Sequence, residues 1–353
     1  MAKQNKDGIT WTHDTWNPVT GCTKVSAGCK HCYAERLFPR VYPGRKFTQV
    51  QCHPERLQQP FHWKTPKVIF VNSMSDLFHP DVPDDFIGDV INVIGRCPQH
   101  TFQILTKRPE RARELFTPEP DRIEELRQIV ADAREVVPTW DWPLPNLWLG
   151  VSVENQETAD ERIPILLQTP AALHFVSYEP ALGPVDFYST LGGTQWIGGQ
   201  RGCRGEHHGI GTPECPTELH HHHDVRCNKG IDWIICGGES GPNARPMHPD
   251  WARSTLDQCI AYGVLFFFKQ WGDWVPVAQY PGANTTARRV WGTVTHNAFF
   301  PKAGPPDTAG NPLITVRLGK KKTGRLLDGQ VWDQFPTTRG PCLHPLPAPY
   351  QKS

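Results

Sequence analysis

The sequence lacks both a net charge and any long apolar run. Its 37 Lys and Arg residues are balanced by 36 Asp and Glu residues, so the formal net charge is +1 and no global field draws the chain onto polyanions. No apolar run approaches the length that spans a bilayer, and residues 1–8 lack the apolar core of a secretion signal. We therefore expect a cytoplasmic protein without a membrane partner, while a nucleic-acid partner is neither implied nor excluded.

Cysteine is plentiful, with 11 residues in the chain. In a cytoplasmic protein these should be reduced thiols, which favours metal ligands and buried apolar side chains over disulfides. Cys97 and Cys259 lie in helix-like stretches and Cys236 lies in a strand-like one, so we expect these three to pack in the core. Cys52 and Cys342 receive no role from the pattern.

Six short apolar runs rich in β-branched and aromatic residues predict buried strands. Helical patterns between them, such as Asp84–Ile94 and Asp121–Val137, predict parallel βα units. The fold class expected is therefore α/β, with a partial or complete parallel (β/α) barrel. The predicted strands are Lys67–Val71, Thr101–Leu105, Leu147–Val153, Leu173–Tyr178, Asp232–Cys236 and Val264–Phe268.

Two stretches interrupt this alternation. Residues 191–229 form a Gly-, Cys- and His-rich insertion where a helix is expected, and the tail from about residue 280 is rich in Pro and Gly. We expect one barrel over residues 1–279, including the insertion, and an irregular extension over residues 280–353 with a weak strand pattern at Leu313–Leu318.

Polar residues directly follow the predicted strands. In a parallel barrel these positions meet at the carboxyl end of the sheet, where ligands bind. The alternative is that the strands simply exit into solvent. The residues concerned are Asn72, Ser73, Asp76, Lys107, Arg108, Glu154, Glu179, Glu239, Lys269 and Gln270.

Three cysteines near the amino terminus are spaced C-x6-C-x2-C, at Cys22, Cys29 and Cys32. Three thiolates on one short loop can each bind one iron of a four-iron cluster and leave the fourth iron open for a ligand. The alternatives are a structural zinc site, with His31 or Cys52 as fourth ligand, and no metal at all.

This segment resembles the cysteine loop of the radical S-adenosylmethionine (SAM) superfamily, although the gap between Cys22 and Cys29 is longer than the commonest spacing there. A closer resemblance, over most of the chain, is to a phage-associated three-cysteine family that is common in bacteriophage and mycobacterial genomes and has no settled function. The strings that carry it are WNPVTGC (16–22), GCKHCYAER (28–36), VNSMSDLFH (71–79), LTKRPER (105–111), GVSVENQ (150–156), SYEPALGPVD (177–186), GGESGPNARPM (237–247), FFKQWG (267–272) and GRLLDGQVWDQFP (324–336).

The resemblance implies a barrel of the radical SAM type, a [4Fe–4S] cluster on the three cysteines and SAM on the open iron. Residues expected to contact SAM are Asn72, Ser73, Asp76, Ser152, Glu154 and Glu239, the last within a Gly-Gly-Glu motif that follows a late strand rather than the usual early one. Residues assigned to the substrate are Lys107, Arg108, Glu179, Lys269 and Gln270, with the alternative that the basic ones only form ion pairs.

The insertion carries a second set of candidate metal ligands. Thiolates and imidazoles are the ligands that zinc prefers, but the spacing matches no short-knuckle pattern, so a zinc site competes with a second iron–sulfur cluster and with a solvated loop. The residues are Cys203, Cys215, Cys227, His207, His208, His220 and His222.

The function expected from this resemblance is reductive cleavage of SAM to a 5′-deoxyadenosyl radical that abstracts a hydrogen atom, with electrons from a reductant protein. By analogy the substrate is a nucleobase, nucleoside or nucleic acid undergoing modification or repair. The alternative is a non-catalytic or regulatory protein in which zinc or a redox-sensing cluster stabilises a module that binds nucleic acid or a protein partner.

Overall fold

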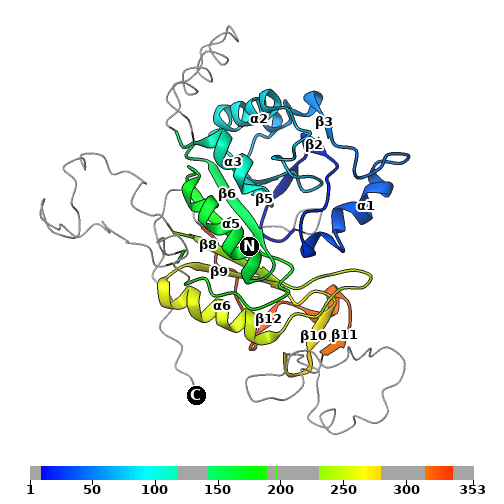
Figure 1. Cartoon of the computed structure of the whole chain (residues 1–353), viewed down its shortest axis with the longest axis vertical. Coiled ribbons are helices and arrows are strands. Elements are labelled where there is room, and N and C mark those ends of the chain that lie inside the picture. Colours follow the sequence, from blue (N-terminus) through cyan, green and yellow to red (C-terminus); the bar gives the residue numbers. More distant parts are fainter. Residues whose placement is uncertain (1–8, 118–141, 189–195, 198–229, 280–314, 337–353) are drawn as a thin grey trace, which may run out of the picture.

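The computed structural model describes residues 9–117, 142–188, 196–197, 230–279 and 315–336 (Figure 1). Its centre is a seven-stranded sheet in which every neighbouring pair is parallel. The strands, in their order across the sheet, are β1 (Asp14–Trp16), β4 (Val68–Val71), β5 (Thr101–Thr106), β6 (Leu147–Val153), β7 (Leu173–Tyr178), β8 (Trp233–Gly237) and β9 (Leu265–Gln270).

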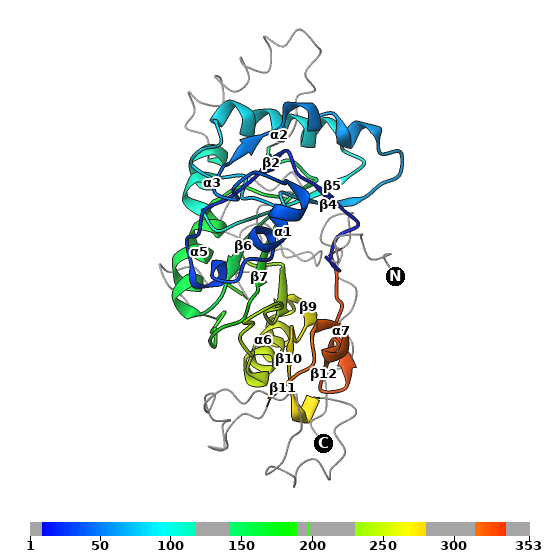
Figure 2. The same ribbon diagram turned by 90° about the vertical axis from the view of Figure 1, so that its right-hand side faces the viewer.

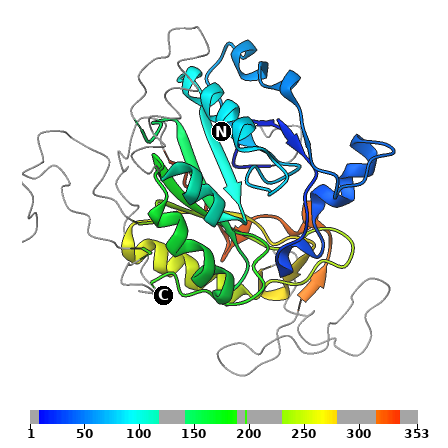
Figure 3. The same cartoon turned by 45° about the horizontal axis from the view of Figure 1, so that its top comes forward.

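The sheet curls, and four helices cover its outer face (Figure 3). Within the described ranges the two edge strands, β1 and β9, are not paired with each other, so the structure is a partial (β/α) barrel. The predicted fold class is confirmed, and all six predicted strands are present. The covering helices are α2 (Asp84–Arg96), α3 (Pro109–Phe116), α5 (Gln156–Gln168) and α6 (Pro249–Tyr262).

The inside of the barrel is filled by large aromatic side chains, which form a buried cluster separate from the core beneath the helices. A side chain at Gly150 on β6 would collide with the ring of Phe175 on β7, so this layer has no spare room. Since the interior is packed, a ligand has access only at the ends of the strands. The interior aromatics are Trp11, Phe70, Trp148, Phe175, Trp233 and Phe267.

Shorter elements surround the barrel. The chain between β1 and β4 contains β2 (Val19–Thr20), η1 (Ala27–Cys29), α1 (Tyr33–Val41), β3 (Gln51–Cys52), η2 (Pro54–Arg56) and η3 (Gln59–His62). After β9 come β10 (Trp274–Pro276), η6 (Val277–Gln279), β11 (Thr315–Arg317), α7 (Lys320–Thr323), β12 (Leu326–Leu327) and β13 (Gln330–Val331).

The structure also tests the predictions for the buried cysteines and for the tail. Cys97, Cys236 and Cys259 are buried in the main core, which confirms their packing role. The weak strand pattern at 313–318 corresponds to β11, which pairs with β10 in an antiparallel ladder. The helix expected over 121–137 lies outside the described residues. None of the helices in the described part is both long and apolar enough to cross a membrane.

Candidate functional site

The three cysteines line one cavity at the carboxyl ends of the strands. The segment from β2 to α1 crosses this end of the barrel, and Gly21 joins it to the segment after β4 through an N–H donated to Met74 O at 3.1 Å. The cavity has a volume of about 150 Å³. Predicted site residues in its wall are Cys22, Cys29, Cys32, Asn72, Ser73, Asp76, Lys107, Arg108 and Ser152.

The cysteine loop, residues 22–32, is tied to three different strand ends. Arg108, after β5, donates to Thr23 O at 3.1 Å. Glu154, after β6, accepts a hydrogen bond from Ser26 Oγ at 2.8 Å, and Arg245, in the turn after β8, donates to Ala27 O at 3.0 Å. These ties, all within the protein, fix the loop across the barrel mouth.

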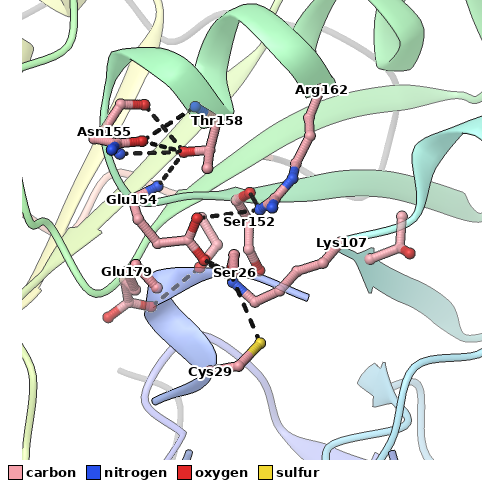
Figure 4. Close-up of polar contacts among 12 residues, drawn as sticks. Ser26, Cys29, Lys107, Ser152, Glu154, Asn155, Thr158, Arg162 and Glu179 are labelled. Carbon is pink, nitrogen blue, oxygen red and sulfur yellow. Dashed lines mark hydrogen bonds and ion pairs between the residues drawn. The ribbon is translucent and has the colours of Figure 1, made fainter. Parts of the chain in front are cut away.

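Glu154 is a structural anchor for this loop (Figure 4). Its carboxylate is fully buried and is shared between Lys107, Ser26 and Arg162, with the Arg162 contact at 3.1 Å. Burial by itself raises the pKa of this carboxyl, but Lys107 and Arg162 outweigh that effect and hold the pKa below its ordinary value. Glu154 is therefore ionised, and its oxygens are already bound by groups of the protein rather than left for a ligand.

Asp76 lines the cavity and holds Arg108 in place there. It accepts hydrogen bonds from Thr106 Oγ1 at 2.8 Å and from the Lys107 N–H at 3.0 Å, and it pairs with Arg108 at 3.1 Å. Arg108 in turn places Nη1 3.7 Å from the Cys22 sulfur. Burial and Asp76 raise the pKa of Cys22 to about 11 although Arg108 lowers it, so metal binding there must displace a proton.

Asn72 contributes a buried donor that no other described residue pairs with. Its backbone is left-handed, with φ of 63°, and its Oδ1 accepts a hydrogen bond from the Val19 N–H at 3.2 Å. In the described part of the chain its Nδ2 has no hydrogen-bond partner, although Asn72 is only 3% exposed and lines the cavity. Leaving a buried donor unpaired costs about 1–3 kcal/mol, so this geometry suits an acceptor on a ligand.

The remaining predicted residues do not line the cavity. Glu239 is bound by Arg245 through contacts of 2.6–2.9 Å, Glu179 pairs with Lys269 at 3.2 Å, and Gln270 donates to Ser240 Oγ at 3.0 Å.

Among the described residues, no three His, Cys, Asp or Glu side chains are close enough together to hold one metal ion. A four-iron cluster does not require such convergence, because each thiolate binds a different iron. The insertion's candidate ligands lie outside the described residues.

Three residues that position the loop were missed by the sequence reasoning: Ser26, Arg162 and Arg245. Ser26 lies between Cys22 and Cys29, and Arg245 follows Glu239 by six residues in the segment GGESGPNARPM (237–247). Arg162 lies on α5 and is 2% exposed. The only sequence signal for Arg162 was a charged residue at a position that the helical periodicity buries.

Gly28 provides a test of how tightly the loop is seated. A Cβ at this position would collide with the Glu154 side chain, which three partners hold in place. We expect Gly28→Ala to displace the loop, because overpacking at a fixed contact costs about 1–3 kcal/mol, and to lower the iron bound after anaerobic reconstitution to less than about half of wild type. Gly88→Ala is the matched control, since nothing lies within 4 Å of that position in α2. Equal iron in both variants would contradict the seating described here.

The fold and site together define an open (β/α)-barrel protein with a three-cysteine cavity at the carboxyl end of its sheet. The chain belongs to the family described as "Protein of unknown function (DUF5131)", whose profile matches residues 6–336. No curated protein is significantly similar to it. Among solved structures it is similar to a Cys-to-Ser mutant of spore photoproduct lyase, at 12% identity and a TM-score of 0.30. That match covers 51% of this chain and 48% of the other, so it spans about half of each.

Proposed function

We propose that Cys22, Cys29 and Cys32 bind a [4Fe–4S] cluster whose open iron takes SAM, and that the protein is a radical SAM enzyme. The observation that carries this proposal is that one cavity brings together the three thiols and the unpaired amide donor of Asn72. The donor set fits the cofactor, because three thiols leave one iron of the cluster without a protein ligand. When bound, the cluster and SAM supply one-electron cleavage of SAM and, from it, hydrogen-atom abstraction from a substrate.

The chain's own residues position and shield this site. The Asn72 Nδ2 would donate a hydrogen bond to an acceptor of SAM, such as its carboxylate, because an amide N–H pairs with an acceptor and not with the SAM ammonium group. Arg108 is held by Asp76 beside the Cys22 sulfur, where a fixed positive charge stabilises the thiolate. Phe70 and Leu105 line the same cavity and give it an apolar part, where the non-polar portions of SAM or a substrate would pack.

The direct test is release of 5′-deoxyadenosine by the anaerobically reconstituted protein with SAM and dithionite. We expect product from wild type and none from Cys29→Ala, scored by chromatography. An intact cluster with no SAM binding, and no product in the presence of nucleosides, DNA or RNA, would overturn the proposal of an enzyme. The protein would then be a regulatory metal-binding protein.

Asn72→Asp tests the ligand contact separately from the cluster. The variant keeps the Oδ1 that accepts from Val19 and replaces the free donor with an acceptor, so we expect normal iron content and an affinity for SAM at least about tenfold weaker. Isothermal titration of SAM into the reconstituted protein measures this. Asn243→Asp is the control, because Asn243 is exposed and shares the left-handed backbone, with φ of 60°. Unchanged SAM affinity in Asn72→Asp would remove Asn72 from the site.

A further inference from the structure

Cationic side chains from four separate elements gather around the turn after β8. Arg36 lies on α1, directly after the cysteine loop, and its guanidinium contacts Gly241 so closely that any Cβ there would collide with it. Arg317, at the end of β11, donates to Gly241 O at 2.9 Å. Two guanidinium groups, from residues 281 positions apart in sequence, thus meet at one glycine.

Two lysines extend this cluster. Lys269 is the second-last residue of β9, and Lys320 begins α7. Figure 2 shows α1 in front of the strands, with α7 below it on the same side. The pKa of Lys320 is lowered, first by partial burial and then by the positive charges of Lys269 and Arg36. Lys320 is therefore within electrostatic range of both Lys269 and Arg36, and also of Asp273, which attracts it. Gly319, directly before Lys320, donates its N–H to Asp273 O at 3.1 Å, which places α7 beside the ion pair of Asp273 and Arg317. Lys321 and Lys322 add two exposed positive charges on the same helix.

Carboxylates neutralise only part of this charge. Glu179 pairs with Lys269 at 3.2 Å, and Asp273 pairs with Arg317 at 3.3 Å. In the described part of the chain, neither Arg36 nor Lys320 has an ion-pair partner. An excess of like charges held in one place is unfavourable in the free protein and is relieved when an anion binds. The cluster stands out because the chain as a whole has a net charge of only +1.

The cationic cluster adjoins the three-cysteine cavity. Arg36 donates its backbone N–H to Cys32 O at 3.2 Å, and the turn that carries Gly241 also carries Arg245, which contacts Ala27 of the cysteine loop. A molecule held by the cationic cluster therefore lies next to the cysteine loop that lines the cavity. Guanidinium and ammonium groups together suit phosphate oxygens, which accept several charged hydrogen bonds at once.

We propose that Arg36, Lys320 and their neighbours Arg317 and Lys269 bind a phosphate group of the substrate beside the three-cysteine cavity, so that the substrate is a nucleic-acid strand or a nucleotide. The binding of phosphate rests on the cationic cluster alone. Its assignment to the substrate rests on the proposed function.

The test is fluorescence anisotropy of a fluorescein-labelled 12-nucleotide single strand with the full-length reconstituted protein, over a range of salt concentrations. We expect Arg36→Gln and Lys320→Gln each to weaken binding about three- to fivefold and to reduce the slope of log affinity against log salt by about 0.7, the value for one phosphate contact on a single strand. Lys320→Arg should restore binding. The matched control is Lys64→Gln, at an exposed position before β4 and so near the opposite end of the sheet, which should bind as wild type.

Thymidine 5′-monophosphate in excess distinguishes the two sources of phosphate. If the nucleotide displaces the labelled strand, a free nucleotide is sufficient for binding at the site. If the strand stays bound, the site requires a nucleic-acid strand. Binding of thymidine 5′-monophosphate alone is measured by isothermal titration. No binding of either probe, or equal losses in the Lys64→Gln control, overturns the phosphate site. Release of 5′-deoxyadenosine by a protein that binds neither probe leaves the proposed function intact, whereas probe binding without that product leaves only the phosphate site.

Discussion

Replacing Cys29 with Ala should abolish the iron content of the protein. We expect anaerobically reconstituted wild type to carry about four iron and four sulfide ions per chain, and Cys29→Ala to carry less than about one, because two thiolates do not retain a four-iron cluster against exchange. Cys22→Ala and Cys32→Ala should behave alike, since all three side chains line the same cavity. Iron and sulfide assays with an anaerobic absorbance spectrum measure the loss.

Cys52→Ala is the matched control for this series. Cys52 is half-buried and free, and it lies in β3 opposite Val19 rather than in the cavity wall. Its replacement should leave iron and sulfide at the wild-type level. If wild type holds one equivalent of zinc and no iron, and all three cavity variants lose that zinc, the site is a structural zinc site and not an iron–sulfur cluster. Loss of metal in Cys52→Ala as well would make Cys52 the fourth ligand.

Replacing Glu154 with Ala should produce the largest loss of stability. The change removes the buried carboxylate partner of the Arg162 guanidinium, which is 2% exposed, and leaves it only the exposed Glu161 at 3.7 Å. It also releases Ser26 and Lys107. Removing one partner of a buried ion pair costs about 3–5 kcal/mol, because the other charge remains buried and uncompensated. We expect the free energy of unfolding in urea to fall by that amount, and cluster content to fall with it as the loop is released.

The same carboxylate predicts a pH dependence. Because the folded pKa of Glu154 lies below its ordinary value of 4.5, its contribution is fully present above that pH and is lost as the pH falls through the folded pKa. Wild type should therefore lose more stability than Glu154→Ala between about pH 5 and pH 3. Glu157→Ala, at an exposed position in the first turn of α5, should change the free energy of unfolding by less than about 1 kcal/mol. Parallel pH profiles for wild type and Glu154→Ala would contradict the buried pair.

Local sequence patterns determined the strands and the end of the sheet at which polar residues gather. A buried parallel strand is a short run of apolar residues, so β4 to β9 could be recognised without a structure. The three-cysteine spacing likewise identified the loop that lines the cavity, because its residues are close together in sequence. β1 was not recognised, since Asp14–Trp16 is only three residues long and carries one buried side chain.

Only the tertiary structure decided which polar residues remain available to a ligand. Asn72, Glu154 and Glu239 all follow strands and looked equivalent in sequence, yet Glu154 is taken by Arg162 and Lys107, and Glu239 by Arg245. Within the described residues, Asn72 lines the cavity and alone of these three has a side-chain donor without a partner. Which partner a charge meets depends on side chains brought together from distant elements, because electrostatic and hydrogen-bond partners are set by separation in space rather than along the chain.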